Sequence, residues 1–503
     1  MQANDPYALD DSKILEAPTT LSGSLRHLGP GFILSASIVG SGELVATTQL
    51  GANAGFVAMW VILVSCLVKV ALQLEFGKRA IMTGETTFSS FNTLPGPKLG
   101  RAHLSIWAWL LLMVFKFLQV GGIVGLVAVL LHMAMPGVAE LIWLCVVVVL
   151  IAAIVSWGYY RILEVLSILM IGLFTLFTLV SLVALQYTEA AIGIKEVLSG
   201  LTFSIPAGDG MLLLVIGAFG ITGVGGDEIM HYNYWLIEKG YASHSGRNDG
   251  SEAWARRAKG WIRVMYIDAI FAMLVYTVVT VAFFLLGSAL LHGKGDFTDG
   301  GQLFLVNLSR LYTETLGEWS APLFYFGAFV VLFSTAFSAL GAWTRQFTDA
   351  FGQIGIINFG RIKERRLWIG ILAWVIPVIW GLVYLSVKNP VWMVFVGGFV
   401  TSIILLVVLF AAIVFKIRRK GSVITTGRSY EAAFWLSAAM ILFVGIWSVT
   451  QAIRKGRKKS AEGKKVVLTE QVVFLHEGKG NQQRSGFAVR TCEWREVFLC
   501  SNG

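Results

Sequence analysis

Charged residues are scarce in this chain of 503 residues. Asp, Glu, Lys and Arg make up 14% of the sequence, against about 25% in an ordinary globular domain. Proline and cysteine are also rare, with 10 and 4 residues, whereas hydrophobic residues reach 56%. This composition excludes a soluble multidomain enzyme, and so few cysteines exclude a disulfide-rich secreted domain.

Long runs without any charge indicate a polytopic membrane protein. The segments 141–155 and 165–185 hold no charged residue, and a helix crosses a bilayer with about 20 apolar residues. We expect an all-α protein with about eleven transmembrane helices, near residues 30–50, 56–74, 106–131, 141–157, 163–185, 211–237, 264–291, 322–347, 367–387, 391–415 and 433–452.

Basic residues predict the orientation of these helices. They gather in alternate connections, around residues 78–101, 239–259, 361–366 and 416–428, and are sparse in the others. Because Lys and Arg favour cytoplasmic loops, we expect a multi-pass protein of the cell membrane with a cytoplasmic N-terminus. The net charge of +10 is read as this topology signal, so no nucleic-acid partner is expected.

Two spans carry glycine-rich stretches at mid-membrane depth. The first contains Gly40-Ser41-Gly42-Glu43, and the sixth contains Gly223, Gly225 and Gly226 before Asp227 and Glu228. Glycine is a poor helix former. Paired interruptions five spans apart predict an inverted-repeat transporter that binds its substrate where both helices unwind. The alternative is that these glycines serve close helix packing.

The acidic residues beside the glycines are candidate site residues. Carboxylates inside a membrane are costly and usually functional, so Glu43, Asp227 and Glu228 are expected to bind substrate. The alternative is that these acids only cap the second halves of their helices. Phosphate-binding and catalytic sequence motifs are absent from the sequence, so we expect neither an enzyme nor a cofactor.

Several segments resemble the Nramp family of divalent metal transporters. They are Leu25-Arg-His-Leu-Gly-Pro-Gly-Phe-Ile, Thr83-Gly84-Glu85, Tyr160-Arg161-Ile-Leu-Glu164 and the stretch from Ser334 to Phe347, in the family's order. The resemblance implies a LeuT-like fold of two inverted five-helix repeats plus an extra helix. The expected parts are a cytoplasmic segment (1–27), two repeats (28–187 and 188–416), a loop with the eleventh helix (417–453) and a disordered basic tail (454–503).

The sequence departs from the family at the metal site. The family's aspartate ligand aligns with Gly40 and its asparagine with Glu43. The methionine ligand aligns with Gly225, the first histidine with Asp227, and the carbonyl ligand with Thr222. Oxygen ligands without sulfur suit hard cations. We therefore expect Glu43, Asp227 and Thr222 to bind a hard divalent ion such as Mg²⁺ or Mn²⁺.

The coupling residues implied by the resemblance differ as well. Two acids used for proton transfer align with Lys116 and Gln119, and a second histidine aligns with Tyr232, next to His231. A fixed positive charge opposes the approach of a proton, and glutamine does not titrate. We therefore expect secondary-active transport by alternating access with weak or absent proton coupling. Two alternatives remain: the same fold carrying a small organic solute, or a non-transporting receptor derived from it.

Three charged residues inside spans have expected partners or positions. Lys116 lies near mid-membrane, so we expect it to pair with an acid such as Glu43 or Asp227. Lys69 and Glu75 lie nearer the cytoplasmic end of the second span. We expect these two side chains to extend toward the membrane interface.

Overall fold

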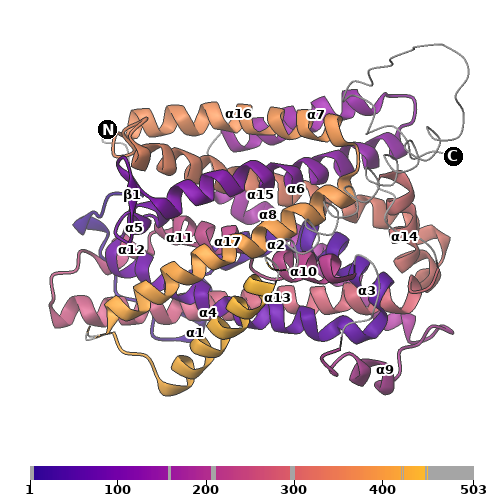
Figure 1. Cartoon of the computed structure of the whole chain (residues 1–503), viewed down its shortest axis with the longest axis horizontal. Helices are drawn as coiled ribbons and strands as arrows, with labels where there is room; N and C mark the ends of the chain where they lie inside the picture. The colour runs from indigo at the N-terminus through magenta and orange to yellow at the C-terminus, as the bar shows by residue number, and fades with distance from the viewer. Residues whose placement is uncertain are drawn as a thin grey trace, which may run out of the picture. The chain divides into compact units, whose positions relative to one another are not determined.

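The structure is a computed structural model that describes residues 5–156, 160–204, 211–294, 301–420, 422, 424–447 and 450. These residues are almost entirely helical (Figure 1). Their one pair of strands, β1 (Lys98–Leu99) and β2 (Ala102–His103), is antiparallel and short. The expectation of an all-α protein is therefore confirmed.

The helices follow one another with short connections. Their bounds are α1 (Leu21–Leu25), α2 (Pro30–Ile38), α3 (Thr48–Ala54), α4 (Met59–Thr83), α5 (Thr87–Phe91), α6 (Leu104–Ala134), α7 (Glu140–Ser156), α8 (Tyr160–Leu185), α9 (Ile194–Ser199), α10 (Met211–Ile221), α11 (Gly226–Lys239), α12 (Tyr241–Ser245), α13 (Glu252–Leu290), α14 (Gln302–Leu316), α15 (Ala321–Ile354), α16 (Ile362–Val387) and α17 (Pro390–Arg419). A further apolar helix spans Arg428–Trp447.

Each of the eleven predicted spans has a helical counterpart. Among the described residues, eight helical stretches are long and apolar enough to cross a membrane: Gly42–Thr83, Leu104–Ala134, Met211–Lys239, Glu252–Leu290, Glu318–Ile354, Ile362–Val387, Pro390–Arg419 and Arg428–Trp447. The first, fourth and fifth predicted spans correspond to the α2–α3 segment, to α7 and to α8.

The sixth span is broken as predicted. Helix α10 ends at Ile221 and α11 begins at Gly226, so residues 222–225 are not helical. Gly223 has a φ of +62°, a left-handed conformation that glycine adopts without strain. The Thr222 N–H still donates to the Ala218 carbonyl at 2.9 Å and the Gly225 carbonyl accepts from Ile229 at 3.0 Å, so the helical hydrogen-bond pattern stops after Thr222 and resumes at Gly225.

The first span differs from the prediction. A π-helical segment, Val39–Thr47, joins α2 to α3 where we expected an unwound stretch. A π-helix is widened but keeps its backbone hydrogen bonds, so this glycine-rich sequence does not break the helix. Gly42 instead permits close packing, since a Cβ atom there would lie 2.7 Å from the Ile221 carbonyl oxygen at the end of α10.

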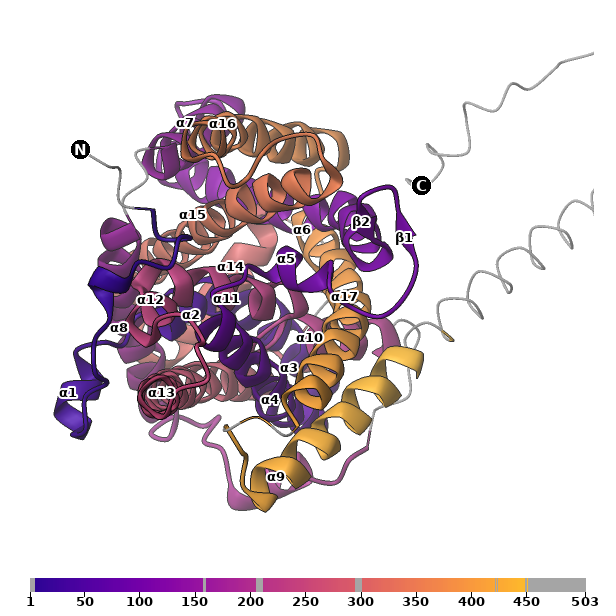
Figure 2. The same ribbon diagram turned by 90° about the vertical axis from the view of Figure 1, so that its left-hand side faces the viewer.

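The π-helical segment and the break in the sixth span lie in the interior of the bundle. Helix α10 packs against α17, α4 and the π-helical segment, and α2 packs against α13, α15 and α8. Both views place α10 and α2 inside the ring of longer helices (Figures 1 and 2). The packing therefore brings the predicted site residues of the first and sixth spans together.

The predicted division into two five-helix repeats, at residues 28–187 and 188–416, stays a prediction. The basic tail predicted for 454–503 lies outside the described residues.

Candidate functional site

Glu43 faces the break in the sixth span. It is fully buried in the π-helical segment, and its Oε1 accepts a hydrogen bond of 2.8 Å from the Thr280 hydroxyl of α13. The Gly223 backbone N–H lies 3.5 Å from the same oxygen. The second oxygen, Oε2, is buried without a hydrogen-bond partner among the described residues. A buried carboxylate oxygen in this state is a ready ligand for a cation.

Lys69 of α4 holds the carbonyl end of α10. Its ammonium is fully buried and donates hydrogen bonds to the Phe219 carbonyl, to that of Gly220 at 3.2 Å and to that of Thr222 at 2.9 Å. Ser65 lies one turn earlier on the same face of α4. Its Oγ lies 2.9 Å from the Phe219 oxygen and 2.8 Å from the Thr222 oxygen. The last carbonyls of α10 are thus bound by side chains.

Lys116 of α6 pairs with Asp227 in the first turn of α11. The two charged atoms lie 3.0 Å apart and both side chains are buried. The ammonium also donates to the Thr401 hydroxyl of α17. The prediction that Lys116 pairs with Glu43 or Asp227 is confirmed for Asp227, and the pair joins three helices beside the break.

Glu228 lies at the edge of the same group. Gly225 is the residue before α11, and a Cβ atom on it would overlap Oε2 of Glu228. The Glu228 side chain therefore folds back over the start of its helix, as an acid that favours a helix N-terminus does. It is partly exposed and interacts electrostatically with Asp227 and Lys116. Both readings of this residue, as a cap and as a ligand, fit its position.

The other predicted residues of the sixth span interact with neighbouring helices. The His231 ring nitrogen Nε2 lies 2.9 Å from Oε1 of Gln346 on α15. The Tyr232 hydroxyl donates to Asp268 of α13 at 3.0 Å. Asp268 also accepts the backbone N–H of Gly31 at 2.6 Å. These contacts link α11 to α15, α13 and the start of α2, and the gating role expected for His231 and Tyr232 stays a prediction.

Two predicted residues serve close packing. A Cβ atom on Gly40 would overlap the Thr335 hydroxyl of α15, so Gly40 lets the π-helical segment approach that helix. Gln119 is buried on α6 against Gly397 of α17, where a Cβ atom would overlap its side chain. Neither residue is placed to bind a cation through a charge.

The predicted metal ligands each have protein partners. The Thr222 hydroxyl donates to Ser65 at 2.9 Å, and the Thr222 carbonyl accepts from Lys69. Asp227 pairs with Lys116. Within the part of the chain that the structure describes, no group of three or more His, Cys, Asp or Glu side chains is arranged to hold a metal ion. A bound cation would therefore depend on few carboxylates, completed by water or other oxygens.

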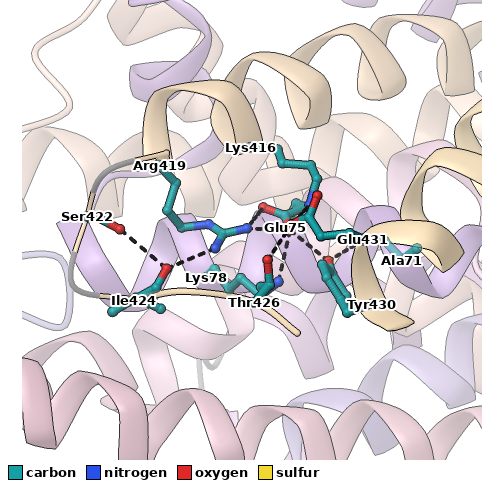
Figure 3. A network of polar contacts seen from close by, with 10 residues as sticks. All are labelled: Ala71, Glu75, Lys78, Lys416, Arg419, Ser422, Ile424, Thr426, Tyr430 and Glu431. Carbon is teal, nitrogen blue, oxygen red and sulfur yellow. Dashed lines mark hydrogen bonds and ion pairs between the residues drawn. The ribbon is translucent and has the colours of Figure 1, made fainter. Parts of the chain in front are cut away.

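The expectation for Lys69 and Glu75 is wrong. Neither side chain extends to the membrane interface, because both are buried inside the bundle. Glu75 accepts from Arg419 at 2.8 and 3.0 Å, from Lys78 at 2.9 Å and from the Tyr430 hydroxyl at 2.7 Å (Figure 3). Glu75 thereby joins α4 to the end of α17 and to the helix Arg428–Trp447. The position of a residue along a membrane span does not indicate whether neighbouring helices cover its side chain.

Four residues that contact the site were not predicted from the sequence: Ser65, Lys69, Thr280 and Thr401. One signal was available for the first two. They lie four residues apart and so share a face of their helix, and a hydroxyl and an ammonium on one face of a membrane helix indicate a polar partner. Nothing in the sequence identifies that partner as the end of α10, about 150 residues further on.

The family model of natural resistance-associated macrophage protein-like proteins (Nramp) matches residues 31–451. An uncharacterized protein of Pasteurella multocida is 24% identical over 333 residues, which cover 65% of this chain and 71% of that protein.

Solved structures share the fold. The manganese transporter of Eremococcus coleocola, in a mutant form, matches with a TM-score of 0.67 and 13% identity, over 88% of this chain and 91% of that one. Mhp1, a nucleobase-cation-symport-1 family transporter, matches with a TM-score of 0.53 and 13% identity, over 89% and 97%. The fold is therefore LeuT-like. Since the family model matches most of the chain, this protein belongs to the Nramp family and is a membrane transporter rather than an enzyme.

Proposed function

We propose that this protein is a secondary-active transporter of hard divalent cations, such as Mg²⁺ or Mn²⁺, that works by alternating access. The cation site lies where α10 breaks, between Glu43 on the π-helical segment and the start of α11, and Glu43, Asp227 and Glu228 supply its negative charge. The observation that carries the proposal is the buried Glu43 carboxylate, whose Oε2 has no hydrogen-bond partner among the described residues.

The charges at the site support a divalent ion. Asp227 is compensated by Lys116, whereas Glu43 and Glu228 are in no ion pair within the described chain. Glu43, Asp227 and Glu228 outnumber the ammonium groups of Lys69 and Lys116 at the break, so the group keeps a net negative charge that favours a cation. With few protein ligands available, an ion that keeps several waters is favoured, and Mg²⁺ usually does so.

The same residues argue against proton coupling. Lys116 carries a positive charge next to Asp227, and this charge opposes the arrival of a proton at that carboxylate. Gln119 does not titrate. We therefore propose transport with weak or absent proton movement.

Binding calorimetry on the purified protein tests the proposal. We expect saturable heats with Mg²⁺ and Mn²⁺, weaker binding of Cd²⁺, and loss of these heats in Glu43→Gln. Glu318→Gln, which changes an exposed acid before α15, serves as the control and is expected to bind as the unmodified protein does. Tighter binding of Cd²⁺ than of Mg²⁺ would show that oxygen ligands do not set the selectivity.

A small organic amine is the second candidate substrate. It is favoured by the lack of a three-ligand metal cluster among the described residues, since one ammonium group needs only one carboxylate such as Glu43. If no divalent ion gives a heat while an amine stabilises the protein against unfolding, the organic substrate replaces the metal. Binding of either class without flux across a membrane would indicate a receptor.

A further inference from the structure

We infer that the Lys69 ammonium is a built-in cation that occupies the carbonyl site at the break of α10, and that it thereby determines which ligands a transported ion can use. The inference about the carbonyl site stands on the geometry alone. Its consequence for the substrate rests on the proposed function.

The Lys69 ammonium lies at the carbonyl end of α10. All three carbonyls that Lys69 contacts, those of Phe219, Gly220 and Thr222, belong to the last turn of α10 or directly follow it. The final carbonyls of a helix lack intrahelical partners and carry the negative end of the helix dipole. In broken membrane helices such carbonyls coordinate transported cations. Here an ammonium group takes that place.

Backbone oxygens surround the Lys69 ammonium in place of a carboxylate partner. Lys69 is fully buried, yet within the described residues no carboxylate lies within ion-pair distance of its Nζ. Its ligands are backbone oxygens and the face of the Phe219 ring, whose centre lies 4.8 Å away. An ammonium has three donors and no acceptor, so these three carbonyls use its full capacity. This environment resembles that of a bound metal cation more than that of a salt-bridged lysine.

The Lys69 ammonium is attached to α4 through its own side chain and cannot leave the carbonyls as a free ion would. A metal ion at these carbonyls could leave when the transporter opens, whereas the lysine ammonium is fixed to α4. The carbonyls of Phe219, Gly220 and Thr222 are thus unavailable to the substrate. A transported cation must use Glu43 and the start of α11, and the protein needs no co-transported ion to compensate the end of α10. Lys69 is on this account a specificity-determining residue.

The test removes the tethered ammonium and supplies a free one. Lys69→Ala deletes three methylene groups and the ammonium, which n-propylammonium replaces. Thermal unfolding of the detergent-purified protein is followed with added n-propylammonium, Na⁺ or K⁺. Tetramethylammonium, which has no N–H donor, controls for ionic strength. We expect Lys69→Ala to have a lower Tm, raised saturably by propylammonium on the order of 2–4 °C, while the unmodified protein does not respond.

Two variants keep the inference falsifiable. Ser65→Ala removes a hydrogen bond to the same carbonyls without removing charge, so its lower Tm should not respond to cations. Lys69→Gln retains N–H donors but carries no charge, and its Tm should also be raised by the added cations. It takes the place of Lys69→Ala if that variant cannot be purified. The inference is overturned if Lys69→Gln is as stable as the unmodified protein, or if no cation stabilises or recovers either Lys69 variant.

Calorimetry of cation binding to Lys69→Ala separates this inference from the proposed function. In Lys69→Ala, the freed carbonyls should admit a cation, so Na⁺ or K⁺ binding should appear in calorimetry. If the unmodified protein binds no divalent ion but propylammonium still stabilises Lys69→Ala, the built-in cation is upheld and the divalent-cation proposal fails. If divalent ions bind to the unmodified protein but no cation stabilises Lys69→Ala, the divalent-cation proposal is upheld and the built-in cation is refuted.

Discussion

At the residue scale, the buried ion pair between Lys116 and Asp227 compensates two charges beside the site. Both side chains are buried, 3.0 Å apart, so removing one leaves the other charged and uncompensated. We predict that Lys116→Ala lowers the free energy of unfolding by about 3–5 kcal/mol. The double variant Lys116→Ala with Asp227→Asn should recover most of that loss, as chemical denaturation would show. Equal losses in the single and double variants would contradict the pairing.

Gly40 provides a second prediction at this scale. Its hydrogen faces Thr335, and a Cβ atom would overlap the hydroxyl. Because a well-packed interior cannot absorb an added methyl group, Gly40→Ala should cost about 1–3 kcal/mol. The matched control is Gly370→Ala on α16, where nothing lies within 4 Å of the added carbon, and where alanine favours the helix. Thermal unfolding of the two variants compares them directly, and equal Tm values would refute the packing role.

At the element scale, the polar network around Glu75 attaches the helix Arg428–Trp447 to the rest of the bundle. Tyr430 bonds to Glu75 on α4, and Glu431 pairs with Lys416 at 2.6 Å near the end of α17 (Figure 3). We predict that Tyr430→Phe lowers the free energy of unfolding by about 1.5–3 kcal/mol, since its hydroxyl bonds to a buried charged group.

The control for this network is Tyr325→Phe. The Tyr325 hydroxyl makes a long hydrogen bond of 3.4 Å to Ser309, so its loss should cost less than about 1 kcal/mol. A loss for Tyr430→Phe no larger than that of the control would show that this contact does not hold the last helix in place.

The elements show which parts of the fold could be predicted from the sequence. Apolar runs of sufficient length predicted the helices, and Gly223, Gly225 and Gly226 predicted the break in the sixth span correctly. The similar stretch Gly40–Glu43 instead forms a π-helix. Its glycines allow close contacts with α10 and α15, and the conformation depends on that packing, which local sequence does not contain. For the same reason the partner carbonyls of Lys69 could not be predicted.

At the scale of the whole molecule, the N-terminal segment packs on the connection between α11 and α13. The Leu15 backbone N–H donates to the His244 carbonyl at 3.1 Å, and Trp261 donates to the Leu15 carbonyl at 2.9 Å. The Tyr7 hydroxyl donates to Glu238 at 2.6 Å. Burial, followed by the Glu238 charge, raises the pKa of the Tyr7 phenol, which therefore stays protonated and keeps donating. These contacts support the prediction that the N-terminal segment and this connection share one side of the membrane.

Which side this is follows from the positive-inside rule, and stays a prediction. In a variant without the natural cysteines, Ser12→Cys and Asn248→Cys should resist a membrane-impermeant maleimide in intact cells and react after permeabilisation. Both positions are exposed. Glu318→Cys, exposed before α15, should react from outside. Labelling of Ser12→Cys in intact cells would reverse the orientation.

The central claim is that Glu43 binds a hard divalent cation that crosses the membrane without protons. The most direct measurement records Mn²⁺ influx and internal pH together in proteoliposomes containing the unmodified protein or Glu43→Gln. We predict Mn²⁺ influx without proportional acidification, and a rate reduced about tenfold or more in Glu43→Gln, because a contact with a charged group contributes about 1.5–3 kcal/mol. Acidification in proportion to influx, or unchanged influx in Glu43→Gln, would contradict the account.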